Sequence, residues 1–454
     1  MARRHTLQTL VDALTREIET AMPWRPGDRL PPQRILARDR GIAASTVSRV
    51  YRELARRGLV VGETGRGTYV RAAAPPVAAT PIAPSTLSVD LALNVPVLPE
   101  QARLLADSLA PLLRNSAAFE AALRPVDVTG TPQARQAATR FLSEPRRGRP
   151  RIDPARLIFT ASAKQALLAV IAALTKPGDR VATDALTYPM INTISARLHI
   201  ELVPVPMDEE GMRADLLEAA HLRTPLRAVY CQPTLHNPVG ISMSERRRAE
   251  IVRVLKRHRV IAIEDAVYSF LAPQHPTLYS TAPDQVVLID SLSKRLSPGL
   301  TAGIIAVPAA LIKPVAQSVR AQACGPTGFA LAACTRWMTD GTATAISMAK
   351  RRDAATRQRV LKTIFTGVRG ATLTSGSHAY HAWLTLPAGW RADAFEAAAA
   401  AKGIAVLPAS AFSVVPGHVP NAVRLALASP TLETLESALT TLATLARQHD
   451  PARA

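Results

Sequence analysis

The sequence contains little cysteine and no long hydrophobic run. Its three cysteines, Cys231, Cys324 and Cys334, are an odd number and do not have the spacing of metal ligands. This pattern predicts neither a disulfide framework nor a zinc site, and it fits a reducing compartment. The longest apolar stretch within a helical pattern covers residues 166–174, whereas a membrane-spanning helix needs roughly 20 apolar residues. We therefore expect no membrane segment and no metal site.

The chain also lacks the apolar block of a secretory signal. Its basic first segment, Met-Ala-Arg-Arg, is followed by an amphipathic pattern that includes Asp12, Arg16 and Glu17. A secretory signal would have an apolar block in this place. The sequence therefore favours a cytoplasmic protein.

Lysine is absent from the segment 1–72, which contains 14 arginines against seven aspartates and glutamates. The whole chain has 454 residues, 48% of them apolar, and a net charge of +20. This length predicts two or three domains. Such a charge attracts phosphate backbones, although arginine-rich usage can also reflect genomic composition. Because the charge is densest in the segment 1–72, its placement favours a nucleic acid as the partner of this segment.

The segment 1–72 has the pattern of three helices followed by a hairpin. The expected first helix ends before Pro23, the second lies between Pro32 and Gly41, and the third begins with the residue pair 45–46 as its N-cap. The third helix has a buried stripe formed by Val47, Val50, Tyr51 and Leu54, and an outward stripe formed by Ser45, Thr46, Arg49 and Arg52. Two short apolar runs at 59–61 and 68–70 would form a wing.

Three helices and a hairpin could be no more than a packing unit with an arginine-coated surface. The amino-acid sequence of the segment argues against this, because it closely resembles the winged helix-turn-helix of GntR regulators. The resemblance lies in residues 25–37, Ser45-Thr-Val, Tyr51-Arg-Glu-Leu and Gly65-Arg-Gly-Thr. The resemblance implies a double-stranded DNA operator as partner, and hence association with the nucleoid. It implies operator contacts from Arg34, Ser45, Thr46, Arg49, Gly65, Arg66 and Gly67. Ala44 replaces an arginine that is frequent in relatives, which implies a changed base preference.

The sequence predicts three segments. Residues 1–72 would form the DNA-binding domain, and residues 73–89, which hold four prolines and no charge, would form a semi-stiff linker. Residues 90–454 show strand-like runs that alternate with helical patterns, at 157–160, 180–183, 228–231, 260–264, 286–290 and 303–307. This alternation predicts a mostly parallel sheet covered by helices, with its sites at the carboxyl ends of the strands.

Asp265 and Lys294 each follow such a run, at the ends of two successive strands of the pattern. A lysine that forms a Schiff base and an aspartate that keeps a pyridine nitrogen protonated are the two groups that a pyridoxal phosphate (PLP) site most needs. Asn237 and Tyr268 also follow predicted strands. Each residue taken singly could be a turn, a helix cap or a surface lysine, but their succession in chain order favours a cofactor site.

Residues 90–454 resemble the fold type I, class I and II aminotransferase domain, with a small C-terminal α/β subdomain from about residue 330. The whole chain resembles a MocR-type regulator, a GntR domain fused to an aminotransferase-like domain. The resemblance implies that Lys294 carries the cofactor aldimine, that Asp265 binds the pyridine nitrogen, and that Arg424 binds a ligand carboxylate. It further implies that Asn237 and Tyr268 bind the ring hydroxyl and that Tyr188 stacks on the ring. The remaining expected cofactor-binding residues are Ser162, Ala163, Lys164, Ser291 and Ser293.

The phosphate pocket departs from this pattern. Relatives usually have an arginine at the position of Thr301, a glycine at the position of Ser162, and a tyrosine at the position of Pro125. Backbone N–H groups at the start of the helix after Thr160 could still bind phosphate. Lys164 or Arg295 could replace the missing charge, and the sequence does not decide between them.

Three functions follow from these patterns. The first is a homodimeric regulator that binds operator DNA and senses PLP, or its aldimine with an amino compound or amino acid. The second is a working aminotransferase with a DNA-binding appendage. The third is a regulator whose large domain has lost PLP and serves only for dimerisation. Turnover of an amino donor and a visible absorbance spectrum distinguish them.

Overall fold

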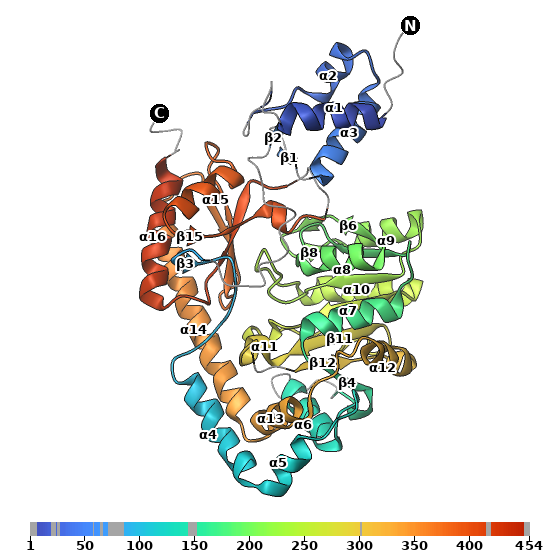
Figure 1. Cartoon of the computed structure of the whole chain (residues 1–454), viewed down its shortest axis with the longest axis vertical. Helices are drawn as coiled ribbons and strands as arrows, with labels where there is room; N and C mark the ends of the chain where they lie inside the picture. Colours follow the sequence, from blue (N-terminus) through green and yellow to red (C-terminus); the bar gives the residue numbers. More distant parts are fainter. Residues whose placement is uncertain are drawn as a thin grey trace.

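The computed structural model describes residues 7–19, 24, 28–57, 59–63, 67–70, 86–143, 152–299, 302–414 and 419–448. These residues form an N-terminal helical domain, a large α/β subdomain and a small α/β subdomain (Figure 1). Within this part of the chain, no helix is long and apolar enough to cross a membrane. The predictions for Gly65, Arg66 and Thr301, and for most of the linker, concern positions outside the described residues.

The N-terminal domain contains the predicted helix-turn-helix and hairpin. Its elements are α1 (Leu7–Glu19), α2 (Gln33–Asp39), α3 (Ala44–Arg56), β1 (Val60–Glu63) and β2 (Gly67–Val70). The antiparallel pair β1 and β2 is the wing. The predicted stripe of α3 is confirmed as buried: Val47, Val50, Tyr51 and Leu54 pack into one core with residues of α1 and α2.

The predicted N-cap of α3 is wrong. The N-cap is Ala43, two residues before Ser45, and it forms no side-chain capping bond. The carbonyl of Ala43 accepts hydrogen bonds from the backbone N–H groups of Thr46 and Val47. Ser45 and Thr46 therefore lie inside the first turn, because backbone bonds rather than a hydroxyl start this helix.

The large subdomain is built on a seven-stranded sheet with the order β4-β12-β11-β10-β9-β5-β6. Its strands are β4 (Leu157–Thr160), β5 (Arg180–Asp184), β6 (Glu201–Val205), β9 (Ala228–Cys231), β10 (Ile261–Asp265), β11 (Val286–Ser291) and β12 (Gly303–Ala306). Only β12 runs antiparallel to its neighbours in this sheet. The mostly parallel sheet is confirmed, and it has the carboxyl ends of six strands at one edge.

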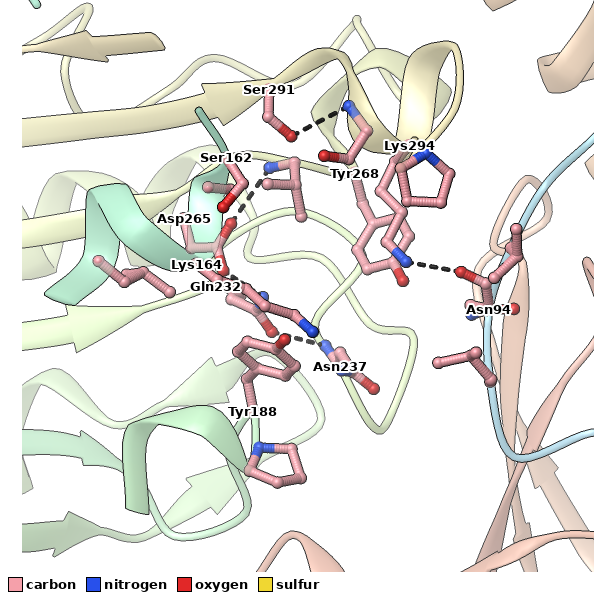
Figure 2. Close-up of a pocket in the computed structure, with 18 of the residues that line it drawn as sticks. Asn94, Ser162, Lys164, Tyr188, Gln232, Asn237, Asp265, Tyr268, Ser291 and Lys294 are labelled. Atoms are coloured by element: carbon pink, nitrogen blue, oxygen red, sulfur yellow. Dashed lines mark hydrogen bonds between the residues drawn. The ribbon is translucent and has the colours of Figure 1, made fainter. Parts of the chain in front are cut away.

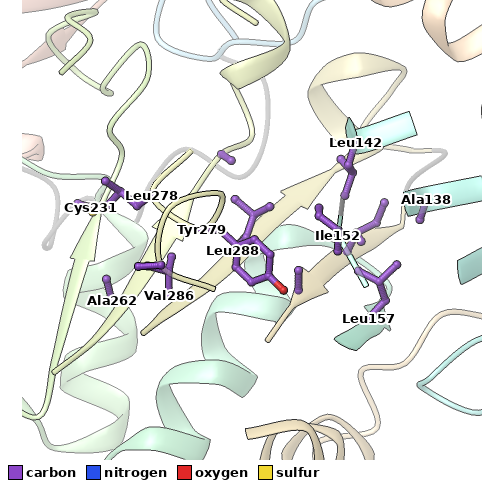
Figure 3. Close-up of a cluster of buried hydrophobic side chains, with 14 of the residues drawn as sticks. Ala138, Leu142, Ile152, Leu157, Cys231, Ala262, Leu278, Tyr279, Val286 and Leu288 are labelled. Atoms are coloured by element: carbon purple, nitrogen blue, oxygen red, sulfur yellow. The ribbon is translucent and has the colours of Figure 1, made fainter. Parts of the chain in front are cut away.

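Side chains alternate between the two faces of this sheet and form two cores. On one face, Val229, Ala262 and Leu288 pack with residues of a first set of helices. Figure 3 shows part of this core. That set includes α4 (Gln101–Arg114), α6 (Pro132–Ser143), α9 (Ala214–Arg223), α10 (Glu245–His258) and α13 (Gly328–Thr339). On the other face, Ala228 and Ile263 pack against α7 (Ala163–Leu174), α8 (Met190–Leu198) and α12 (Ile312–Ala321).

The sequence patterns missed strand β6. Its Pro204 interrupts an otherwise strand-like run and pairs with Thr183 of β5. Proline is acceptable here because β6 lies at the edge of the sheet, where its missing N–H has no further strand to bind.

The small subdomain is built on an antiparallel sheet with the order β13-β14-β17-β16. Its elements are α14 (Thr342–Phe365), which also reaches the large subdomain, β13 (Thr372–Thr374), β14 (His381–Thr385), α15 (Ala392–Ala401), β15 (Ile404–Ala405), β16 (Leu407–Pro408), β17 (Ala422–Ala426) and α16 (Leu432–Gln448). The short strand β3 (Val89–Asp90) pairs in parallel with β15. The last residue of the predicted linker and the residue after it therefore pack with this subdomain, far from them in sequence.

The wing contacts the small subdomain. The backbone N–H of Val419 donates a hydrogen bond to the carbonyl of Gly62 in β1, over 3.4 Å. The guanidinium of Arg391 lies over the ring of Tyr69 in β2, 4.1 Å from its centroid. Figure 1 shows the N-terminal domain beside this subdomain. Both strands of the wing are thus held by residues of the small subdomain.

Candidate functional site

A pocket of about 460 Å³ opens at the carboxyl edge of the large sheet and continues to the small subdomain (Figure 2). Sites of open α/β sheets lie at this edge. The pocket is lined by all ten predicted cofactor residues and by Arg424: Ser162, Ala163, Lys164, Tyr188, Asn237, Asp265, Tyr268, Ser291, Ser293, Lys294 and Arg424. Residues from five strand ends and from β17 therefore converge on one cavity.

Lys294 lies in the short helix α11 (Leu292–Arg295), directly after β11. Its Nζ donates a hydrogen bond to the backbone carbonyl of Asn94, over 2.6 Å, and lies 5.9 Å from the ring centroid of Tyr268. A second lysine supports this turn from behind, because the buried Lys350 donates to the carbonyls of Lys294 and Leu296. Burial, and then the charge of Lys294, lower the pKa of Lys350 to about 7.

Asp265 is the last residue of β10 and is buried. Its Oδ2 accepts hydrogen bonds from the Tyr230 hydroxyl, at 2.9 Å, and from Nε2 of Gln232, at 2.8 Å. Burial raises the pKa of Asp265, and these two hydrogen bonds act in the opposite direction. A cation placed beside this carboxylate in the pocket would stabilise its ionised form.

Three further predicted residues surround the same space. Asn237 is fixed by Gln232, whose Oε1 accepts its backbone N–H over 3.1 Å. Tyr268 is buried next to the imidazole of His381, with ring centroids 5.2 Å apart. Tyr188 is half-buried, and burial raises the pKa of its phenol. In Figure 2 the Tyr188 ring faces into the cavity from the side opposite Ser291.

Arg424, on β17, is a buried cation in the pocket wall. Its Nη1 donates to Oδ1 of Asn237 over 3.3 Å, and its Nη2 donates to the carbonyl of Ala92. Its Nε has no hydrogen-bond partner, and its guanidinium lies 5.2 Å from the ring centroid of Phe412. Burial lowers its pKa to about 10, so it remains protonated at neutral pH.

The first turn of α7 forms one end of the pocket. Ser162 is its N-cap, and its side chain accepts the backbone N–H of Gln165. The backbone N–H groups before Gln165 in this turn have no intrahelical acceptor. Lys164 lines the pocket in this turn. Burial, followed by the charge of Lys294, lowers the pKa of Lys164. The open N–H groups of this turn, with a lysine beside them, favour an anion at this end of the cavity.

Arg295 does not reach the pocket. It is buried and pairs with Asp290 at 2.6 Å, between the rings of Phe141 and Phe270. It is therefore not available as a replacement for the arginine that is missing at position 301. Pro125 lies exposed on the loop after α5 (Ser116–Ala122) and does not line the cavity.

Among the residues of the site that the sequence reasoning missed, five have a clear place in its geometry. Tyr230 and Gln232 position Asp265, Lys350 supports the turn of Lys294, and Asn94 and Phe412 line the pocket. Gln232 could have been found, since it begins the segment that contains Asn237. The others lie in ordinary helix, strand or loop patterns that carry no local signal.

The predicted DNA-contacting residues that are described lie on the N-terminal domain. Arg34, Ser45 and Arg49 are exposed, and Thr46 is half-buried. Gly67 has a φ of 120°, and a Cβ at this position would approach Nε of Arg29 to 2.6 Å, so the start of β2 requires glycine. Among the described residues, no group of three or more His, Cys, Asp or Glu side chains could hold a metal ion.

Two family models match the chain. The model "Aminotransferase class I and II" matches residues 88–442, and "Bacterial regulatory proteins, gntR family" matches residues 6–70. The HTH-type transcriptional regulator YdeF of Bacillus subtilis is 28% identical, over 91% of this chain and 88% of that protein. The "Vitamin B6 salvage pathway transcriptional repressor PtsJ" of Salmonella typhimurium is 30% identical, over 66% of this chain and 67% of its own.

Solved structures share the fold of the large and small subdomains. The multiple substrate aminotransferase of Thermococcus profundus is similar with a TM-score of 0.73 and 24% identity, over 80% of this chain and 92% of its own. The aspartate aminotransferase of Thermus thermophilus with maleate has a TM-score of 0.67 and 18% identity, over 92% and 97% of the two chains. At these identities the likeness establishes the fold.

The class I and II aminotransferase fold implies pyridoxal 5'-phosphate as the cofactor. The residues of the pocket fit this group: an amine at Lys294, a buried carboxylate at Asp265 for the pyridine nitrogen, and the open helix turn beside Lys164 for an anion. The chain therefore belongs to the class I and II aminotransferase family and carries a gntR-family domain before it, the combination of a MocR-type regulator.

Proposed function

We propose that this chain is a transcriptional regulator that binds operator DNA through its winged helix and senses PLP, alone or together with an amino compound, in its aminotransferase-like part. We assign residues 1–72 to DNA binding, 73–89 to a linker and 90–454 to sensing, as a homodimer. The regulators among the relatives support the DNA-binding part. One observation supports the sensing part: the wing contacts the small subdomain, which lines part of the pocket.

The outward face of α3 supports major-groove binding. Ser45 lies in its first turn and Arg49 one turn later, both exposed on the side opposite the buried stripe, and the half-buried Thr46 lies at the edge of that side. A recognition helix meets base edges with its N-terminal residues, and arginine pairs with guanine or phosphate. Arg34 on α2 and the wing would add backbone contacts.

Replacing Arg49 by alanine should weaken binding to operator DNA by about 1–3 kcal/mol, because a recognition-helix arginine is lost. The measurement is fluorescence anisotropy with a duplex selected from a random library by the intact protein. Arg103→Ala, which removes an exposed arginine of α4, is the matched control and should bind normally. Equal losses in both variants would contradict the role of α3.

When bound, PLP supplies an aldehyde that reacts with amines and an electron-withdrawing ring. Lys294 would hold it covalently, and Asp265 would keep a proton on the pyridine nitrogen because Tyr230 and Gln232 fix its carboxylate. Tyr188 would cover one face of the ring. Asn237 and Tyr268 would bind its hydroxyl, with Asn237 held in place by Gln232.

The phosphate would be bound by the first turn of α7, together with Ser291 and Ser293. Ser291 caps α11 and accepts the backbone N–H of Ser293. Lys164 is the described cation nearest in sequence to the open N–H groups of α7. Since Arg295 is committed to Asp290, Lys164 supplies the charge that an arginine at position 301 provides in relatives.

Replacing Lys164 by alanine should raise the dissociation constant for PLP about tenfold, which corresponds to roughly 1.4 kcal/mol. The quantity to measure is the visible absorbance of the holoprotein as PLP is titrated. Lys176→Ala, an exposed lysine after the same helix, is the control. Adding Thr301→Arg to the Lys164→Ala chain should restore affinity. Unchanged affinity in Lys164→Ala would assign the phosphate charge to another group.

A continuous set of contacts connects the pocket with the wing. Leu407, Phe412 and Ala92 line the pocket, and they belong to a group of buried side chains, here called the wall cluster, that also includes Val419. The backbone N–H of Val419 binds Gly62 of the wing. A ligand that shifts the small subdomain would therefore change the position of the wing, and coupling requires such a connection between the two sites.

The proposal is tested by the operator affinity of the intact protein in three states: without PLP, with PLP, and with PLP plus single amino acids. We expect at least one step to change the affinity several-fold. We also expect Tyr69→Ala, which removes the contact with Arg391, to reduce that change. Identical affinities in all three states would overturn the proposal.

The pocket also supports a second function, a working aminotransferase, because Lys294, Asp265 and Arg424 line one cavity. Multiple-turnover conversion of an amino donor and a keto acid, together with an operator affinity that does not depend on PLP, would establish this second function. A chain that binds DNA but acquires no absorbance with excess PLP would instead be a scaffold regulator.

A further inference from the structure

We infer that the effector of this regulator is an amino acid with a single carboxylate and an apolar side chain, and that Asn94 completes the carboxylate site. The inference rests on the proposed sensing function and concerns the part of the pocket next to the small subdomain. Its starting point is the buried guanidinium of Arg424, whose Nε has no hydrogen-bond partner. No carboxylate among the described residues forms an ion pair with it.

A second unsatisfied donor lies in the same wall. Asn94 is 3% exposed, and its Nδ2 has no hydrogen-bond partner, whereas its backbone carbonyl accepts Lys294. Its chain neighbour Ala92 binds Arg424 through the backbone. Figure 2 shows Asn94 across the cavity from the strand ends, beside the amine of Lys294. A ligand whose amino group meets Lys294 can place its carboxylate between these two donors. Buried donors of this kind are costly until an acceptor binds them.

Apolar side chains lie next to Arg424 on the pocket side. Leu407 lies directly opposite Arg424 in the pair of β16 and β17, and Phe412 covers the guanidinium. Val95 and Leu93 line the pocket from the segment that contains Asn94. An aliphatic or aromatic side chain of the effector would therefore bury apolar surface here.

Charged side chains on the effector have no counter-ion in this half of the pocket. The one acidic residue among the described lining residues is Asp265, which is bound by Tyr230 and Gln232. The cations that line the pocket are Lys164, Lys294 and Arg424. The first two serve the phosphate and the aldehyde, so a second carboxylate or a second amine on the effector would be buried without a partner.

The test uses the holoprotein and its visible absorbance during titration with single compounds. L-leucine and L-phenylalanine should perturb the spectrum at concentrations at least tenfold lower than L-glutamate or L-lysine. 3-Methylbutylamine, which is leucine without its carboxylate, should also be at least tenfold weaker than L-leucine. Tighter binding of L-glutamate would mean that Lys164 receives a second carboxylate, and the inference would be wrong. Equal binding of leucine and the amine, or no spectral response to any compound, would also overturn it.

Two variants test the residues. Asn94→Ala should weaken L-leucine at least tenfold and leave 3-methylbutylamine unchanged, since only the carboxylate loses a donor. Leu407→Arg should shift the preference toward L-glutamate, and retained PLP absorbance would show that the variant folds. If Asn94→Ala weakens both compounds equally, Asn94 acts on the lysine and not on the carboxylate. Failure of the proposed function is separate: leucine would bind as expected and operator affinity would stay constant.

Discussion

The Lys294→Ala protein should show no visible absorbance from covalently bound PLP at any cofactor concentration that saturates the parent chain. The side chain of Lys294 is the amine that follows β11 into the pocket, and its Nζ is held by the carbonyl of Asn94. No other lysine among the described residues is placed to substitute for it: Lys350 is buried against two backbone carbonyls and does not line the cavity. Lys164 lies in the first turn of α7, at the phosphate end.

The measurement is an absorbance spectrum after removal of free PLP. Lys313→Ala, an exposed lysine on α12, is the matched control and should keep the full absorbance. Because the proposed DNA contacts lie on the N-terminal domain, Lys294→Ala should retain operator binding in the absence of PLP. A persistent absorbance in Lys294→Ala would assign the covalent link to another amine, with Lys164 the first to examine.

The second large effect concerns stability. Replacing Arg295 by alanine should lower the free energy of unfolding by about 3–5 kcal/mol, because it leaves the carboxylate of Asp290 buried without its cation. The variant also loses the packing of the guanidinium between Phe141 and Phe270, each with its ring centroid 5.0 Å away. Urea unfolding followed by tryptophan fluorescence is the measurement.

Arg124→Ala is the control for this effect. Arg124 forms an ion pair with Glu120 at 2.9 Å, with both side chains largely exposed. Such a pair contributes about 0–1 kcal/mol, so its loss should be small. A stable Arg295→Ala protein with weakened PLP binding would instead indicate that Arg295 reaches the phosphate, contrary to its place in the structure.

Much of the local structure was predictable from sequence patterns. The helices and hairpin of the N-terminal domain and six of the seven strands of the large sheet follow the periodicity of apolar residues. The pattern of apolar residues predicts these elements because it reflects which side chains within one helix or strand are buried. It failed at β6, where Pro204 is tolerated only because the strand is an edge, and at the start of α3, where backbone bonds replace a side-chain cap.

The sequence by itself also determined which side chains line the pocket. Asp265, Asn237 and Lys294 follow consecutive strands of the pattern, and parallel strands bring their carboxyl ends to one edge, so their convergence needed no coordinates. Only the tertiary structure removed Arg295 from the candidates for the phosphate charge, because its side chain turns away from the pocket and pairs with the buried Asp290. The pairing of β3 with β15 and the contact of the wing with Val419 were equally out of reach. These contacts join residues far apart in sequence, and a local sequence pattern does not indicate which distant segment will pack against it.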